Sequence, residues 1–366
     1  MMKRKMQSQV AIFMRMLDQL PIGLIQTYHR VMSNLKIETE FTRLMNCRLP
    51  IIGAPMFLVS NVDMVVAISE AGGVGTFPAL NYRPIEQYRD ALQAIRARTK
   101  LPIGVNIIVN KSNTRQRDDV KCALDAGVDL FITSLGSPAE VIREAHKNGA
   151  KVVCDVTNLI HAEKVQDLGA DGVVAVGTGA GGHAGPISPL VLIPWLREKL
   201  TIPVIAAGGI ATGSQMAATF ALGASAVHVG TRFIASKEAS VDQAYKDAVV
   251  ASTPEDIVMT SRVSGTPAAV INTPYVQKMG ADLPLALRIL KDNAHTKKYV
   301  VPLIHLLGMR SLENAASKPT WKTVWSAGQS VGLIHEILSC REIVEKLSSE
   351  YIQTLNQMPK VSGAGA

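Results

Sequence analysis

The chain has 366 residues, of which 47% are hydrophobic and 19% are charged, and its formal net charge is +8. This composition indicates a globular protein with a sizeable core and excludes a disordered chain. The basic residues are scattered apart from short clusters at 3–5 and 297–298, and aromatic residues make up only 5%. A nucleic-acid binder would gather both kinds on one face, so the charge favours solubility or the attraction of anionic substrates.

Residues 1–36 form a segment of their own. The segment has a basic start and an apolar stretch that Arg15 and Asp18 interrupt, and no small-residue cleavage site follows cleanly. We predict an amphipathic helical extension, with mitochondrial-type targeting and interfacial membrane binding as the alternatives. No uninterrupted apolar run reaches the ~18 residues that span a bilayer. The sequence therefore predicts a cytoplasmic protein without a transmembrane segment.

The four cysteines show no CxxC or metal-ligand spacing: they are Cys47, Cys122, Cys154 and Cys340. We expect unpaired thiols in a reducing compartment, with no disulfide and no bound metal. On its predicted strand, Cys154 is more typical of a small core residue than of a thiol catalyst. Its neighbour Asp155 then points to the opposite side, where it could face a site at the strand ends.

From Leu49 onward, short β-branched runs alternate with helical stretches at a period of about 25 residues. The predicted strands are Pro50–Ala54, Val74–Phe77, Pro102–Val109, Val128–Ser134, Ala150–Val156, Asp171–Val176, Pro203–Ile210 and Ser225–Phe233. Eight such units, apolar on both faces, predict a (β/α)8 barrel. A doubly wound sheet would carry its glycine-rich turn after the first strand, whereas the glycines here follow the last three.

Four segments are expected along the chain. They are the extension 1–36, the barrel 37–239, an inserted lid or subdomain 240–335 over the strand ends, and a C-terminal helix and tail 336–366. Within the barrel, Ser137 and Pro138 are predicted to open a helix as its cap and first residue. The final helix is predicted over 340–357, packed on the body or on a partner.

The stretch Gly172–Ile187 changes abruptly from an apolar strand to a glycine-rich loop. Glycines let backbone N–H groups approach a flat or anionic ligand closely. In this loop His183 is the one side chain able to exchange a proton near neutral pH. The alternative is a flexible surface loop whose histidine is merely solvated.

Two further turns follow the seventh and eighth strands. Gly208 and Gly209 precede Thr212 and Gly213 at a predicted helix start, where free N–H groups and a helix N-terminus would favour a phosphate. A second such turn is Gly230–Thr231. Phosphate groups commonly bind after these two strands of a barrel, although tight turns without a ligand remain the alternative.

Six motifs, in this order along the chain, resemble the nitronate monooxygenase family, formerly called 2-nitropropane dioxygenases. They are APM (54–56), GVN (104–106), AGGHAG (180–185), AAGGI (206–210), LGASAVHVGTRF (222–233) and WSAGQSVG (325–332). The resemblance covers roughly residues 45–345. The same motifs occur in FMN-dependent enoyl-ACP reductases and in polyketide enoyl reductases.

The resemblance implies that FMN lies across the barrel mouth and that His183 is the catalytic residue. Ala54, Pro55 and Met56 would then border the isoalloxazine, Asn106 would hydrogen-bond it, and Gly181 and Gly182 would let the chain approach it. The phosphate would be held by Gly208, Gly209, Gly230, Thr231 and the backbone of His228 and Val229. Two departures stand out, since many members carry Gln where Val176 stands and an acidic residue where Gly179 stands.

The activity that this resemblance implies is oxidation of alkyl nitronates with O2, with His183 also able to remove the α-proton of a nitroalkane. An NAD(P)H-dependent reductase of enoyl thioesters or quinones is the alternative enzyme. A barrel that binds a phosphorylated ligand without redox catalysis, or a scaffold acting through 1–36, is the alternative from another class. The expected partners are a small-molecule nitronate, O2 and a second copy in a homodimer, with no nucleic acid.

Overall fold

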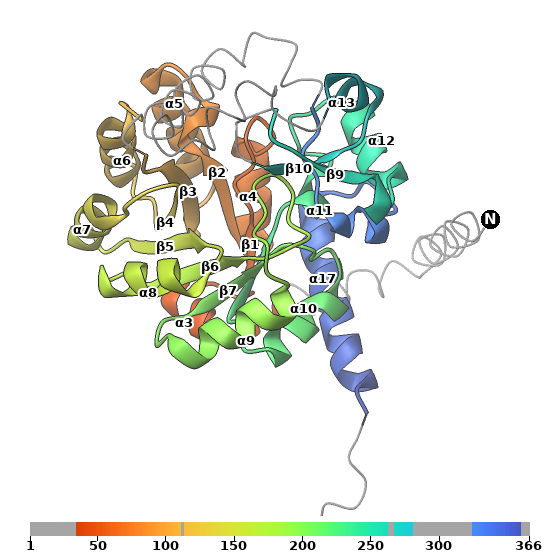
Figure 1. The fold of residues 1–366 in the computed structure, drawn as a ribbon. Helices are drawn as coiled ribbons and strands as arrows, with labels where there is room; N and C mark the ends of the chain where they lie inside the picture. The colour runs from red at the N-terminus through yellow and green to blue at the C-terminus, as the bar shows by residue number, and fades with distance from the viewer. Residues whose placement is uncertain (1–33, 111–112, 263–266, 281–323, 360–366) are drawn as a thin grey trace, which may run out of the picture.

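The computed structural model describes residues 34–110, 113–262, 267–280 and 324–359. Eight parallel strands close into a barrel in sequence order, and β8 pairs with β1 through the register Gly53↔Val229 (Figure 1). The strands are β1 (Ile51–Gly53), β2 (Val74–Pro78), β3 (Ile103–Ile108), β4 (Leu130–Ser134), β5 (Lys151–Val156), β6 (Gly172–Val176), β7 (Val204–Ala207) and β8 (Ala226–Val229). The predicted (β/α)8 barrel is confirmed.

A helix follows each strand and packs on the outside of the barrel (Figure 1). The helices are α4 (Val62–Glu70), α5 (Ile85–Arg98), α6 (Gln116–Asp125), α7 (Ala139–Lys147), α8 (Leu159–Asp167), α9 (Pro189–Lys199), α10 (Gly213–Ala221) and the short α11 (Thr231–Ile234). Asn61 caps α4 by accepting a hydrogen bond from the Met64 N–H at 2.9 Å. The prediction for α7 was wrong in its cap, because Pro138 takes the N-cap position and no side chain caps the helix.

Two strand ends also differ from prediction. The seventh strand was expected to run to Ile210 and the eighth to Phe233, but they end at Ala207 and Val229. Gly208 and Gly209 adopt φ of +104° and +75°, which an extended strand does not allow. After β8 the chain turns directly into α11.

Apolar side chains that point inward fill the lower part of the barrel. Ile52, Leu130, Val153, Val174 and Ile205 belong to one buried cluster. Phe41 and Met45 of α3 (Glu40–Met45) join the same cluster, so this helix covers the amino-terminal end of the barrel. The alternate strand residues face the surrounding helices in a second, larger cluster. Since one end is plugged, a ligand can approach the interior from the carboxyl ends of the strands.

The C-terminal helix α17 (Cys340–Gln357) packs along α10 and α4, as the sequence predicted for a helix returning to the body. A Cβ built on Gly213 would lie 2.2 Å from the backbone N of Tyr351, so α10 and α17 cross in close contact. Tyr351 also meets Phe220 edge to face, with ring centroids 5.6 Å apart. This packing fixes the first turn of α10.

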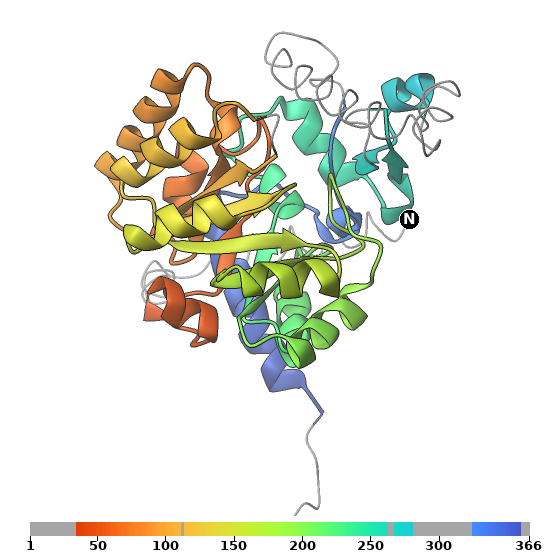
Figure 2. The ribbon, with the colours of Figure 1, turned by 60° about the vertical axis from the view of Figure 1, so that its left-hand side comes forward.

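After the barrel come α12 (Gln243–Ala251), β9 (Ile257–Thr260), β10 (Ala268–Ile271), α13 (Pro274–Met279) and the 3-10 turn η3 (Gln329–Leu333). The strands β9 and β10 form a two-stranded antiparallel sheet beside the barrel (Figure 1). Figure 2 shows the loop after β6 rising from the barrel toward this sheet. The predicted extension up to residue 33 and the cluster at 297–298 lie outside the described residues. Among the described helices, none combines the length and apolar character needed to cross a membrane.

Candidate active site

A polar layer lies at the carboxyl ends of the strands, directly above the apolar barrel interior. Side chains alternate along a strand, and the inward set includes Ile132, Val153 and Val174. The next inward positions are Asn106 on β3, Ser134 on β4, Asp155 on β5, Val176 on β6 and His228 on β8. All five are half-buried, as expected at the mouth of a barrel. Barrel enzymes carry their active sites at this end.

Three of these side chains form a directed chain of hydrogen bonds. The Asn106 amide nitrogen donates to the Ile132 carbonyl at 3.1 Å and to Ser134 Oγ at 2.8 Å. Ser134 Oγ in turn donates to Asp155 Oδ2 at 2.6 Å. Both hydrogens of the Asn106 amide are therefore used, and its Oδ1 is the atom left to accept from a ligand.

Two buried polar atoms in this layer have no hydrogen-bond partner in the described part of the chain. They are Asp155 Oδ1 and His228 Nε2. Burial raises the pKa of Asp155 to about 6, against the opposing effect of the Ser134 hydrogen bond, and burial lowers the pKa of His228 to about 4. An unsatisfied buried atom is costly, so a ligand that supplies partners fits this place.

Asp155 was predicted to face a site at the strand ends, whereas the side chains of His228 and Ser134 were not. His228 was expected to act through its backbone, and Ser134 was assigned no role. Strand alternation was the available signal, because residues two apart on a strand point to the same side. Since Ala226 and Ile132 point inward, His228 and Ser134 must point inward as well.

The segment after β1 lies against the turn after β8. Ala54 N–H donates to the Val229 carbonyl at 2.8 Å. A Cβ built on Gly230 would lie 3.5 Å from Ala54 Cβ and 3.7 Å from Met56 Sδ. The structure thus brings the Ala54–Met56 segment, which includes Pro55, next to the expected phosphate turn at Gly230 and Thr231.

The turn after β7 leaves open space beside its second glycine. Gly209 has φ of +75°, and a Cβ built on it would meet no atom within 4 Å. The backbone N–H groups of Gly208, Gly209 and Gly230 donate no hydrogen bond to the described residues. Open space at Gly209, beside N–H groups that have no partner among the described residues, would suit a phosphate, and the phosphate site at these glycines stays a prediction.

One part of that prediction was wrong, namely the use of the α10 N-terminus. The Gly213 N–H donates to Glu350 Oε2 of α17 at 2.8 Å. Thr212 and Gln215 form a capping box over the same turn. A carboxylate of the chain itself therefore occupies the position expected for a phosphate at this helix end.

The loop that carries His183 is held on two sides. Gly182 N–H donates to the Ala269 carbonyl at 3.0 Å, and Ala269 N–H donates to the Gly182 carbonyl at 2.7 Å. On the other side Gln329 N–H donates to the Gly179 carbonyl at 3.1 Å. His183 itself is exposed. The loop is thus an ordered connection to β10 and η3 rather than a free surface loop.

The two expected flavin-approach glycines differ in what they face. A Cβ on Gly181 would lie 2.8 Å from the backbone of Ala327 and Gly328, so this glycine is needed for contact with that segment. Gly182 has φ of +68° and faces open space. Gly328 N–H also donates to Thr231 Oγ1 at 3.0 Å, which joins the segment to the turn after β8.

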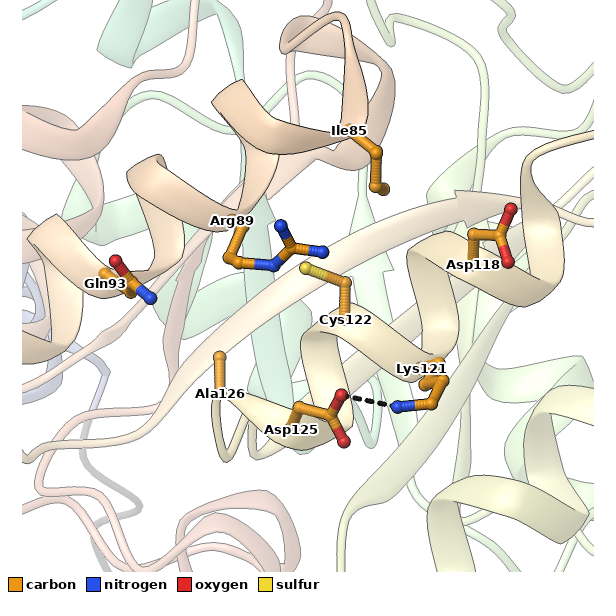
Figure 3. Close-up of a pocket in the computed structure, with 8 residues that line it drawn as sticks. All are labelled: Ile85, Arg89, Gln93, Asp118, Lys121, Cys122, Asp125 and Ala126. Atoms are coloured by element: carbon orange, nitrogen blue, oxygen red, sulfur yellow. Dashed lines mark hydrogen bonds and ion pairs between the residues drawn. The ribbon is translucent and has the colours of Figure 1, made fainter.

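A separate pocket of about 400 Å³ lies between α5 and α6 (Figure 3). Arg89, Lys121, Cys122 and Asp125 are among the side chains that line it, and Lys121 pairs with Asp125 at 2.8 Å. Its lining comes from the outer helices and includes none of the predicted site residues. All four cysteines are free and buried, and burial raises the pKa of Cys154 to about 12, as suits a core thiol.

The nitronate monooxygenase family model matches residues 38–350. The structure of FabK from Thermotoga maritima superposes with a TM-score of 0.74 at 34% identity, covering 88% of this chain and 99% of that one. The nitroalkane oxidase from Streptomyces ansochromogenes gives a TM-score of 0.73 at 26% identity, covering 88% and 100%.

A curated relative from Rhodococcus jostii is 28% identical over 350 residues, which covers 88% of this chain and 98% of the relative. It is named (3aS,4S,5R,7aS)-5-hydroxy-7a-methyl-1-oxo-octahydro-1H-indene-4-carboxyl-CoA dehydrogenase. The family match spans the whole barrel, the strand ends and most of α17. The chain therefore belongs to the nitronate monooxygenase family and is a flavin-dependent oxidoreductase.

Proposed function

We propose that this protein is an FMN-dependent nitronate monooxygenase, which oxidises alkyl nitronates with O2 to carbonyl compounds and nitrite. The observation that carries the proposal is the His183 loop, tied to Ala269 of β10 beside the turns at Gly209 and Gly230. A proton-exchanging group is thereby placed on an ordered loop at the end of the barrel where barrel enzymes act.

The residues present fit FMN as the flavin. The free N–H groups of Gly208, Gly209 and Gly230 would hold its phosphate, and Asn106 Oδ1 would accept from an N–H of the ring system. Ala54 and Met56 would border the ring beside Gly230. When bound, FMN supplies the one-electron oxidation of the nitronate and passes electrons to O2.

The other steps belong to side chains of this chain. His183 removes the α-proton when the substrate is a neutral nitroalkane, whereas a nitronate arrives without that proton. Asn106 orients the ring through an oxygen that its own two hydrogen bonds hold in place. The apolar residues beneath, such as Val153 and Val174, keep water from the barrel interior.

The test is purification of the protein with FMN followed by oxygen-consumption assays. The loaded protein should be yellow and should consume O2 with propionate 3-nitronate or propyl-2-nitronate in the absence of NADH. A colourless preparation that cannot be loaded with FMN would overturn the proposal.

A second candidate is an NAD(P)H-dependent reductase of enoyl thioesters or quinones. The observation that favours it is the relative from Rhodococcus jostii, whose name specifies a carboxyl-CoA compound. Anaerobic mixing with NADH separates the two, because fast bleaching of the flavin supports the reductase and negligible bleaching supports the monooxygenase. A homodimer and a cytoplasmic location stay predictions, as do the limits of the lid at 240–335.

A further inference from the structure

Asp155 is a carboxyl group at the barrel mouth with one oxygen in use and the other buried without a partner. Oδ2 accepts the Ser134 hydroxyl hydrogen at 2.6 Å, and Oδ1 has no partner in the described chain. Its inward neighbours on the same and the next strand, Val153, Val174 and Val176, are apolar. The carboxyl group therefore meets little that would solvate a negative charge.

The direction of the hydrogen-bond chain decides where a proton on Asp155 sits. Asn106 gives one of its amide hydrogens to Ser134 Oγ, so the serine oxygen accepts there and donates its own hydrogen to Asp155 Oδ2. Oδ2 is therefore fixed as an acceptor. A proton taken up by Asp155 is held on Oδ1, the oxygen without a partner.

The charged and titratable groups around Asp155 leave its charge uncompensated. Burial raises its pKa, the Ser134 hydroxyl is the one opposing influence, and no described Lys or Arg contributes. On β5 the thiol of Cys154, which belongs to the buried outer cluster, accepts a hydrogen bond from Thr133 Oγ1. On β8 burial lowers the pKa of His228, so that this histidine is neutral at pH 7. His183 lies on the loop after β6. An anion bound near Asp155 favours protonation of its carboxyl group still further.

We propose that Asp155 takes up one proton from solvent on Oδ1 when an anion binds at the strand ends, and donates that proton in a hydrogen bond to an oxygen of the anion. This inference rests on the proposed function, in which the substrate is an anionic nitronate. A carboxyl group kept neutral by an apolar site can serve as a hydrogen-bond donor in this way. No bond to the substrate is made or broken, and the proton returns to solvent when the anion leaves.

The consequence is a pH-dependent affinity for anions. Where the empty site is ionised, each bound anion must bring one proton, so its dissociation constant rises about tenfold per pH unit above about pH 6. A site whose carboxyl group only supports the fold would show no such coupling.

The experiment titrates the FMN-loaded protein with nitrite, the NO2− anion that the proposed reaction releases, and follows the flavin absorbance. Nitrite stays ionised over the whole range of the titration, from about pH 5 to about pH 8. The wild type and His183→Asn should show the tenfold rise per unit, and Asp155→Asn should lose it. Asp125→Asn, the same change at an exposed helix position, is the matched control and should behave as the wild type. Ser134→Ala should move the onset of the rise to higher pH, because the hydroxyl that favours the carboxylate is gone.

The outcomes separate this inference from the proposed function. Protein that cannot be loaded with FMN overturns the proposed function. If the protein is loaded with FMN but does not bind nitrite even at about pH 5, the inference is overturned and the proposed function is not. The same holds if Asp155→Asn keeps the full tenfold rise of the dissociation constant per pH unit. A rise that disappears in His183→Asn and persists in Asp155→Asn assigns the proton to the histidine and also overturns it. An unchanged onset in Ser134→Ala contradicts the hydrogen-bond direction on which it depends.

Discussion

Gly182 and Ala269 exchange two backbone hydrogen bonds, with N···O distances of 3.0 and 2.7 Å. The first residue belongs to the loop after β6 and the second to β10, in the segment that follows the barrel. Because His183 is the next residue along the loop, its position depends on that later segment. In the proposed function, the position of the proton-exchanging group therefore depends on the segment that is expected to form the lid over the strand ends.

The first prediction concerns His183→Asn. FMN should stay bound, because the turns expected to hold the phosphate lie on other strands. Turnover of neutral nitroalkanes at neutral pH should fall by about 10²- to 10⁴-fold, the usual contribution of a general base. Oxidation of preformed nitronates should fall much less, because they have already lost the α-proton. Steady-state oxygen consumption with a nitroalkane and its nitronate measures both.

Equal losses on the two substrates would reject the base role and leave His183 as a substrate-binding group. Loss of the flavin from the purified variant would instead show that the loop has a structural part. The chemistry would then be sought elsewhere at the barrel mouth, with Asp155 on β5 as the first alternative.

The second prediction concerns Gly181→Ala. The new Cβ would lie 2.8 Å from the backbone of Ala327 and Gly328, so the His183 loop must move away from that segment. A displacement of about 1 Å can cost about 100-fold in rate, and kcat/KM should fall by at least about tenfold. Gly149→Ala is the control for a strained glycine replacement away from the loop, since that turn lies at the other end of the barrel: its φ of +76° makes alanine destabilising although a Cβ there meets nothing within 4 Å, and the variant should lose stability but keep its kcat/KM. A Gly181→Ala variant with wild-type kcat/KM would show that the contact does not position the loop.

The barrel was predictable because its buried parallel strands are short β-branched runs, and α17 was placed at its observed limits because its capping residues are local in sequence. The strand ends after β7 and β8 were misplaced because apolar residues continue past the glycines that end each strand. Glu350 caps α10 from 137 residues away, and local sequence holds no sign of such a partner. Likewise, His228 reaches the barrel mouth only because the closed barrel sets the register of β8.

The third prediction separates the glycine turn after β7 from the N-terminus of α10, which were first expected to act together on a phosphate. Gly209→Ala puts a methyl group into the open space at this turn and, at a φ of +75°, also strains the backbone, so FMN binding should weaken by at least about tenfold, or about 1.4 kcal/mol. Glu350→Ala removes the cap of Gly213 and should cost about 1 kcal/mol of unfolding free energy while leaving FMN affinity unchanged. Equilibrium dialysis and denaturant unfolding measure the two effects. Weaker FMN binding in Glu350→Ala would restore a role for the α10 N-terminus.

The fourth prediction concerns His228, whose pKa burial lowers to about 4. The unfolded chain binds a proton at this histidine below about pH 6.5, and the folded chain does so only below about pH 4, so the unfolded state holds more protons between them. The flavin-free protein should therefore lose up to about 3 kcal/mol of stability as the pH falls through that window. His228→Gln should lack this loss in urea unfolding, whereas His161→Gln, at an exposed position on α8, should keep it.

The fifth prediction is that Asp155→Asn stabilises the flavin-free protein at neutral pH. Burial raises the pKa of the folded carboxyl group from 3.8 to about 6, so the folded state holds more protons than the unfolded state between these values. The sign is thus opposite to that of His228, and wild-type stability should fall as the pH rises from about 4 to about 6, by up to about 3 kcal/mol. Asparagine cannot ionise, and its side-chain oxygen can still accept from Ser134. The variant should match the wild type near pH 4 and exceed it by up to about 3 kcal/mol at about pH 8, while Asp125→Asn shows no such gain. Unfolding free energies from urea titrations at both pH values test this prediction. A variant less stable than the wild type at about pH 8 would contradict it, because the carboxylate would then be stabilised in the folded protein.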